Sequence, residues 1–260
     1  MAREGTAIVT RHGTGFGTLL AAALLAAGCT AIQTTSGEAW LARHQADARG
    51  GLDPAFAAAA AVEPRLRFPA RIGIAHLESG TIAPIPAADA AAWNAAAEAL
   101  GPEFGTFVPV NRLIAELLSG PEGAAITGTP LARSMRLIRL AAARQHLDAV
   151  LIYESAASTD VTKNVLAMAD ITLVGMFVVL GQDIEVQAAA SALLIDVAQA
   201  YPYLEVQATA SDGALATSYS AGDTGRTIAA RLREEAVAKV AADAVPAFRA
   251  LRERLAERSR

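Results

Sequence analysis

The chain has little cysteine, few aromatic residues and no concentration of basic charge. Cys29 is the only cysteine among 260 residues, so no disulfide can form within the chain and the core must be stable without one. Aromatic residues make up 5% of the sequence, which leaves few side chains for stacking on bases. The formal net charge is −4 and the basic residues are scattered, so no nucleic-acid partner is expected.

A hydrophobic run long enough to cross a membrane is also missing. A spanning helix needs about 20 consecutive apolar residues. The uncharged run from Gly17 to Gly28 is about 12 residues long, and the run from Ile171 to Leu180 is about 10 residues long and directly follows Asp170. We therefore expect the segment 165–180 to be a buried strand, or a strand preceded by one helical turn, rather than a membrane span.

What is present at the start of the chain is a pattern typical of a secretion signal. Arg3 and Arg11 give it a basic start, the short uncharged run follows, and a polar stretch from Thr30 to Glu38 comes next. This order predicts a signal peptide over residues 1–28.

The end of this run resembles the lipobox of bacterial lipoproteins, in which small residues precede a cysteine that becomes acylated. The residues that carry the resemblance are Leu25, Ala26, Ala27, Gly28 and Cys29. The resemblance implies cleavage before Cys29, attachment of diacylglycerol to its thiol, and fatty acyl chains such as palmitate as the membrane anchor. Thr30 stands where lipoproteins kept in the inner membrane have Asp, so the resemblance implies the outer membrane, facing the periplasm.

The remaining chain is 53% hydrophobic and 18% charged over the whole sequence, which is the composition of a globular protein. Turn-prone residues break the segment after Cys29, so we expect a tether with a short helix over 29–69. The α/β domain is expected over 70–246. Pro246 should kink the last long helix or begin a new one, which gives a charged C-terminal helix over 247–260.

Alternation and helical periodicity place the elements of this domain. Strands are expected at 71–77, 104–110, 148–154, 190–197 and 203–210, the last two joined as a hairpin through 199–202. Helices are expected at 87–100, 111–118, 130–146 and 222–244. The fold class is α/β, with α+β as an alternative, built on a single mixed sheet with helices packed on it.

This order of elements resembles the α/β domain of lipoproteins related to the curli-secretion lipoprotein and the penicillin-binding-protein activators. Residues 171–211 are more specifically similar to the core of the rhombotarget lipoproteins. Members of that family end in a glycine-rich tail processed by a rhomboid-type protease. The present sequence ends in RERLAERSR, so that processing is not expected, and the resemblance implies no catalytic residues.

Two groups of residues are candidates for binding. Ser155, Ser158 and Asp160 follow the strand 148–154, and ligands of open α/β sheets bind beyond the carboxyl ends of strands. This loop is the possible ligand site of a periplasmic hydrolase or a small-ligand carrier. Tyr201, Tyr203 and Tyr219 gather around the hairpin and are a possible partner surface, although half-buried strand and turn aromatics would give the same pattern.

Other polar residues give weaker signals. Asp148, Asp170, Asp183 and Asp196 lie near strand ends, where acid–base work is possible but turn and cap roles are the favoured interpretation. The histidines His44, His76 and His146 are far apart and lack metal-binding spacing, so no metal and no cofactor are expected. The leading hypothesis is a non-enzymatic, lipid-anchored envelope protein that binds an envelope partner or a second copy of itself.

Overall fold

The computed structural model describes residues 29–45, 51–119, 128–163, 182–216 and 221–258. The signal segment and the run 165–180 lie outside these ranges, apart from Cys29 onward. The described strands form one seven-stranded mixed sheet in the order β1-β7-β6-β5-β2-β3, with β4 pairing β2. This confirms the expected α/β class and the single mixed sheet.

The strands differ greatly in length. Their bounds are β1 Cys29–Ile32, β2 Ala70–Glu78, β3 Thr81–Ala83, β4 Gly105–Pro109, β5 Ala149–Lys163, β6 Gln182–Asp196 and β7 Pro202–Ala216. The strands β4 and β5 run parallel to β2, whereas β5, β6 and β7 form an antiparallel meander. The expected hairpin between β6 and β7 is present, but β5, β6 and β7 each have 15 residues and are about twice as long as expected.

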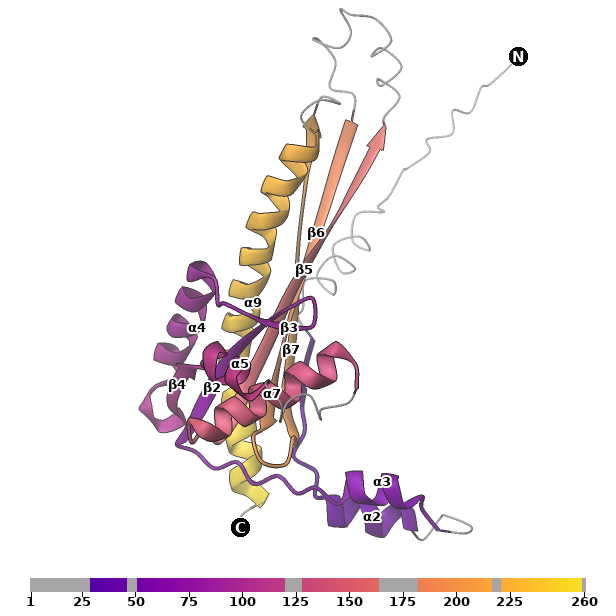
Figure 1. The fold of residues 1–260 in the computed structure, drawn as a ribbon, viewed down its shortest axis with the longest axis vertical. Helices are drawn as coiled ribbons and strands as arrows, with labels where there is room; N and C mark the ends of the chain where they lie inside the picture. The colour runs from indigo at the N-terminus through magenta and orange to yellow at the C-terminus, as the bar shows by residue number, and fades with distance from the viewer. Residues whose placement is uncertain (1–28, 46–50, 120–127, 164–181, 217–220, 259–260) are drawn as a thin grey trace, which may run out of the picture.

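Helices cover both faces of the lower part of the sheet. Their bounds are α2 Gly37–Gln45, α3 Pro54–Ala60, α4 Ala87–Leu100, the short 3-10 helix η1 Pro102–Phe104, α5 Arg112–Leu118, α7 Pro130–Arg144 and α9 Ala221–Arg258. The helices α4 and α9 pack on one face, and α5 and α7 pack on the other (Figure 1). In the middle of the sheet, five consecutive β5 residues, Ala149–Tyr153, are buried, as expected for a central strand.

Local sequence explains several of the helix ends. Thr129 and Asn111 accept hydrogen bonds from backbone N–H groups in the first turns of α7 and α5. The helix α4 ends at Gly101, whose φ of 86° suits glycine. The expected helix 87–100 coincides with α4, and 130–146 exceeds α7 by two residues at its end.

The helix α9 continues through Pro246 to Arg258, so the charged C-terminal helix expected over 247–260 is the last part of α9. Proline removes one hydrogen bond from the helix. The cost is offset because Phe248 and Leu251, beyond the proline, are buried in the core. With 38 residues at about 1.5 Å each, α9 runs along almost the whole length of the meander (Figure 1).

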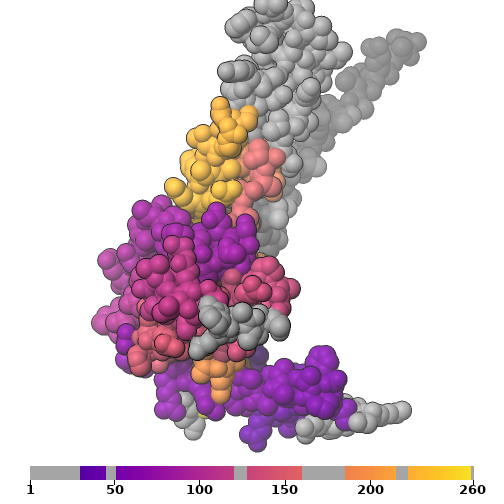
Figure 2. Space-filling model, viewed as in Figure 1, coloured from indigo at the N-terminus to yellow at the C-terminus, as the bar shows by residue number. Residues whose placement is uncertain are grey.

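The long strands extend beyond the rest of the domain. We call Ser155–Lys163, Gln182–Ala190 and Ala208–Ala216, together with the start of α9, the extension. Figure 2 shows α9 and the strands as a projection narrower than the base of the molecule. Its inner face is lined with alanine, whereas large side chains such as Tyr153, Tyr203 and Phe248 fill the base. Small side chains let α9 approach the sheet closely, and the extension is thin for this reason.

The segment 29–69 contains more structure than the expected tether with a short helix. Its first four residues, β1, pair antiparallel with β7 at the edge of the sheet. The helices α2 and α3 follow, packed against one another. The hydroxyl of Tyr203 accepts hydrogen bonds from the backbone N–H groups of Arg65 and Leu66, at 2.9 and 2.8 Å. The segment is therefore attached to the domain at both ends.

Candidate functional site

The predicted acylation site lies in the sheet itself. Cys29 is the first residue of β1 and is opposite Gln207 of β7, and the pairing continues to Ile32 opposite Leu204. The lipobox residues Leu25, Ala26, Ala27 and Gly28 precede the described residues. None of the helices in the described ranges is both long and apolar enough to cross a membrane.

The tyrosines around the β6–β7 hairpin do not form an exposed partner surface, which corrects that expectation. Tyr203 is fully buried and Tyr201 is 5% exposed. The Tyr203 hydroxyl also donates to Asp196 Oδ2 at 3.3 Å, and the Tyr201 hydroxyl donates to the backbone oxygen of Thr35 at 2.8 Å. Both rings are covered because residues 33–66 fold back over them. Tyr219 lies outside the described residues.

Burial also changes the acidity of these two phenols. It raises the pKa of Tyr203, against the two backbone N–H groups that act in the opposite direction. It raises the pKa of Tyr201 to about 12. Both hydroxyls therefore stay protonated at physiological pH and serve as structural hydrogen-bond donors.

Ser155, Ser158 and Asp160 lie within β5, not in a loop after it, and this corrects the expected ligand loop. The strand does not end at Glu154, because its pairing with β6 continues to Lys163. Since side chains alternate along a strand, Ser155 and Ser158 face opposite sides of the sheet. They cannot converge on one substrate, so the structure gives no support to a hydrolase built on this stretch.

The strand-end carboxylates have structural roles where their side chains are described. Asp148 accepts a 2.7 Å hydrogen bond from the backbone N–H of Arg71, and Asp196 accepts one of 2.7 Å from Gln199 in the hairpin. The side chains of Asp170 and Asp183 lie outside the described part. His44 stacks on Trp40, and His146 is exposed at the end of α7. No group of metal ligands occurs among the described residues.

A buried polar cluster that the sequence analysis did not single out joins β2, α4 and β5. The Tyr153 hydroxyl donates a 2.9 Å hydrogen bond to Asp89 Oδ2. The imidazole of His76, which is paired with Tyr153 in the sheet, stacks on the phenol ring with centroids 4.8 Å apart. His76 Nδ1 lies 2.9 Å from the carbonyl oxygen of Pro84 and must donate to it, because a carbonyl only accepts.

Burial dominates the electrostatics of this cluster. It raises the pKa of the Asp89 carboxyl, and Glu234 raises it further, whereas the hydrogen bond from Tyr153 and the nearby His76 act in the opposite direction. Burial together with the Asp89 charge also raises the pKa of Tyr153. The Tyr153 hydroxyl therefore remains a donor, and the carboxylate of Asp89 is held in surroundings that disfavour its charge.

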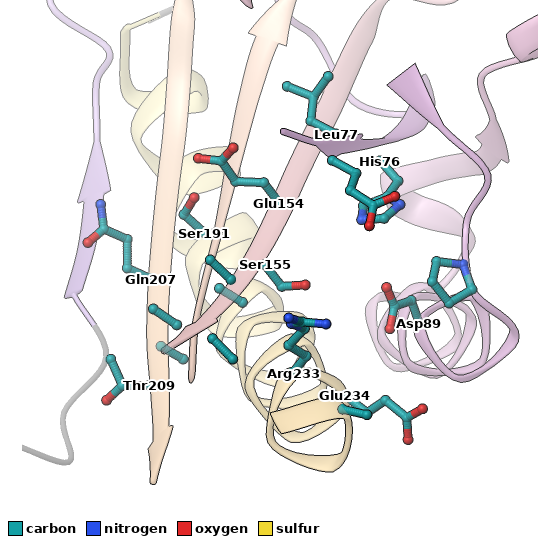
Figure 3. Close-up of a pocket in the computed structure, with 18 of the residues that line it drawn as sticks. His76, Leu77, Asp89, Glu154, Ser155, Ser191, Gln207, Thr209, Arg233 and Glu234 are labelled. Carbon is teal, nitrogen blue, oxygen red and sulfur yellow. The ribbon is translucent and has the colours of Figure 1, made fainter. Parts of the chain in front are cut away.

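His76 and Asp89 line a cavity of about 740 Å³ where β2 ends and β5 continues alone. Asp89 and Arg233 point into it from α4 and α9, and the hydroxyl of Ser155 points into it from β5 (Figure 3). Ser155 is thus placed at a cavity, as expected of a ligand contact, although Ser158 is not. The sequence offered one weak signal for this site, namely two polar residues, His76 and Tyr153, inside apolar strands.

No protein-family model matches the chain, and no curated protein matches it. Among solved structures, the fold is similar to the dodecamer of a PelC variant from Paraburkholderia phytofirmans, with 14% identity and a TM-score of 0.29 over 69% of this chain and 88% of that chain. It is also similar to lipoprotein GNA1162 from Neisseria meningitidis, with 16% identity and a TM-score of 0.29 over 62% of this chain and 96% of that chain. Function is therefore inferred from the chain's own residues.

Proposed function

We propose that this protein is a bacterial envelope lipoprotein, acylated at Cys29 and facing the periplasm from the outer membrane, whose α/β domain is a non-enzymatic assembly module. One observation supports this best. The residue that the lipobox pattern marks for acylation is also the first residue of β1. The anchor and the folded sheet meet at Cys29.

The anchor is sufficient without a membrane-spanning helix. Each methylene group of an acyl chain that enters the bilayer contributes about 0.8 kcal/mol, and two or three chains hold a protein essentially permanently. Because Cys29 is paired with Gln207, a lipid there fixes the domain close to the membrane surface. Every copy in one membrane then has the same orientation.

The extension offers surfaces for self-association. Within the described residues, the pairing of β2 with β5 ends at Leu77 opposite Glu154, and the pairing of β1 with β7 ends at Cys29 opposite Gln207. Beyond these points, 155–163 and 208–216 have a described partner strand on one side only. Open strand edges present unpaired N–H and C=O groups that a second chain can pair with.

The direction of the two edges suits copies that share a membrane. The strands β5 and β7 run parallel, since each is antiparallel to β6. Copies with the same orientation can therefore add β5 of one to β7 of the next as a parallel pair. This contact is head-to-tail, so it repeats and closes into a ring or continues as a filament. Lys239 covers one carbonyl of the β7 edge, that of Thr209 at 3.3 Å, but such an exposed contact is displaced at little cost.

Disulfide crosslinking in isolated envelopes tests the assembly. Ala156 and Thr209 are both exposed and lie in one row, each opposite Ala189. Within one chain they are two strand spacings apart, roughly 10 Å, too far for a disulfide. A disulfide between Ala156→Cys and Thr209→Cys must therefore join two copies. The natural cysteine does not interfere, because acylation consumes its thiol.

We expect oxidation to give a ladder of covalent oligomers for one register, found by combining Ala156→Cys with a cysteine at Gln207, Thr209 or Ser211. The single variant Ala156→Cys is the matched control and should remain monomeric, because a head-to-tail contact does not bring two copies of one position together. Monomers in all three double variants, or dimers from Ala156→Cys alone, would contradict this mode of assembly.

A further inference from the structure

The cavity at the end of β2 is a second feature, independent of the anchor and of the open edges. It lies between α4, the sheet and the stretch of α9 that contains Ala230, Arg233 and Glu234. The cavity exists because β2 stops while β5 continues, and because the side chains on the adjacent strands are small, namely Ala157, Ala190 and Ala208. Its volume of about 740 Å³ is within the range of small-molecule sites.

Two nearly buried polar side chains have free atoms at this cavity. Asp89 is 4% exposed and His76 is 7% exposed. Each uses one atom internally, Oδ2 toward Tyr153 and Nδ1 toward Pro84. Considering only the described residues, Asp89 Oδ1 and His76 Nε2 have no hydrogen-bond partner. Because Nδ1 is the donor, Nε2 of the neutral ring is an acceptor, so the two free atoms are both acceptors.

The charge around them is mostly negative. The carboxylates of Glu78, Glu154 and Glu234 line the same cavity as Asp89, and Arg233 is the one guanidinium among the lining residues. None of these five side chains forms a salt bridge within the described ranges. An anionic ligand would meet four carboxylates, whereas a cation would relieve the cost of the buried Asp89 charge.

We propose that this cavity binds a small ligand that carries a protonated amine, with the ammonium group donating to Asp89 Oδ1 and His76 Nε2. An ammonium group has three donors and no acceptor, which matches two converging acceptors. Ser155 and Glu234 are placed to contact the remainder of the ligand, and Arg233 can bind a carboxylate on it. Tyr153 is a positioning residue, because its hydroxyl holds Asp89 without facing the ligand.

Calorimetric titration of the full mature protein in detergent tests this site, with 1,4-diaminobutane as the probe. Succinate and 1,4-butanediol have the same chain length and provide the anionic and neutral comparisons. We expect saturable binding of the diamine and none of the other two. Asp89→Asn should weaken diamine binding by about tenfold or more, since it removes a charge-assisted hydrogen bond at a buried position.

Two further variants keep the result interpretable if Asp89→Asn disturbs folding. Ala230 is exposed and lines the cavity, so Ala230→Arg adds a cation there without touching the core and should abolish diamine binding. Glu116→Gln removes an exposed carboxylate from α5, away from the cavity, and should leave binding unchanged. The proposal is overturned if the diamine does not bind, if its binding survives Ala230→Arg, or if succinate binds as well as the diamine.

Discussion

Cys29 lies directly opposite Gln207 in the antiparallel pairing of β1 with β7. A lipid on Cys29 is consequently attached to the middle of a long strand and not to a flexible linker. Beyond Gln207, β7 continues to Ala216, which is about 30 Å at the usual rise of an antiparallel strand. The extension therefore starts at the level of the anchor, and its open edges are held close to the membrane.

The hydroxyl of Tyr203 should be important for the stability of the domain. Tyr203→Phe leaves the N–H groups of Arg65 and Leu66 without their acceptor, and leaving buried donors unsatisfied costs about 1–3 kcal/mol. Tyr201→Phe is the matched control, because it removes a single bond to Thr35, worth about 0.5–1.5 kcal/mol. Urea unfolding monitored by circular dichroism measures both. Equal losses for the two variants would contradict the role given to Tyr203.

Gly105 should tolerate no side chain. Its φ is 106°, and an added Cβ would lie 1.9 Å from the backbone oxygen of Ala70 in β2. Gly105→Ala must therefore separate β4 from β2 in addition to adopting an unfavourable φ, and we expect a loss of more than about 2 kcal/mol in the free energy of unfolding. Gly222→Ala, in the first turn of α9 with space around it, should be neutral or slightly stabilising. A thermal-unfolding midpoint for Gly105→Ala close to that of the parent would show that this contact is not rigid.

The raised pKa of Asp89 predicts the sign of a pH effect. The folded protein binds the Asp89 proton more tightly than the unfolded chain does. The stability that this carboxyl contributes is thus present at low pH and is lost as the pH rises from its ordinary value through the raised folded value. Asp89→Asn keeps an acceptor for Tyr153 and cannot ionise, so its stability should vary less over that window.

Urea unfolding of the parent and of Asp89→Asn between about pH 4 and about pH 7 measures this difference. At the upper end of the range, we expect the variant to be at least as stable as the parent. If the variant is instead less stable there, the ionised carboxylate has a stabilising partner and the assignment of Asp89 as a free acceptor is wrong.

Hydrogen exchange should distinguish the extension from the base. The inner face of the extension buries alanines such as Ala188 and Ala210, which contribute little apolar area, whereas Tyr153, Leu194 and Phe248 pack in the base. Backbone amides at 186–190 of β6 should therefore exchange faster than those at 192–195 of the same strand. In isolated monomers this difference should be largest, and assembly through the edges should reduce it. Equal protection along β6 in the monomer would contradict this account of the extension.

The sequence predicted those elements that carry strong local signals. The helix 87–100 coincides with α4 because Pro86 and Gly101 mark its two ends. The hairpin between β6 and β7 was predicted because polar and apolar residues alternate along 203–210. These signals depend on neighbouring residues only.

The sequence could not predict features that depend on distant residues. Beyond Glu154, β5 is rich in alanine and serine, which suit either face of a sheet, so alternation does not reveal that the strand continues to Lys163. The strand β1 depends on pairing with β7 across most of the chain. Likewise, the burial of Tyr201 and Tyr203 depends on residues 33–66 folding over them, and the cavity combines side chains from β2, α4, β5 and α9.

Membrane attachment has a simple genetic test. Cys29→Ser removes the thiol that would carry diacylglycerol, and we expect the protein to move from the membrane to the soluble fraction. Retention of Cys29→Ser in membranes after a high-salt wash would show that another part of the chain holds it there. A serine in place of Thr30 serves as the control and should leave fractionation unchanged.

The most direct test is mass spectrometry of the N-terminal peptide from protein purified out of bacterial envelopes. The account predicts a mature chain that begins at Cys29, lacks residues 1–28 and carries diacylglycerol on its sulfur. A peptide that spans Gly28 and Cys29 uncut, or a Cys29 with an unmodified thiol, would contradict it.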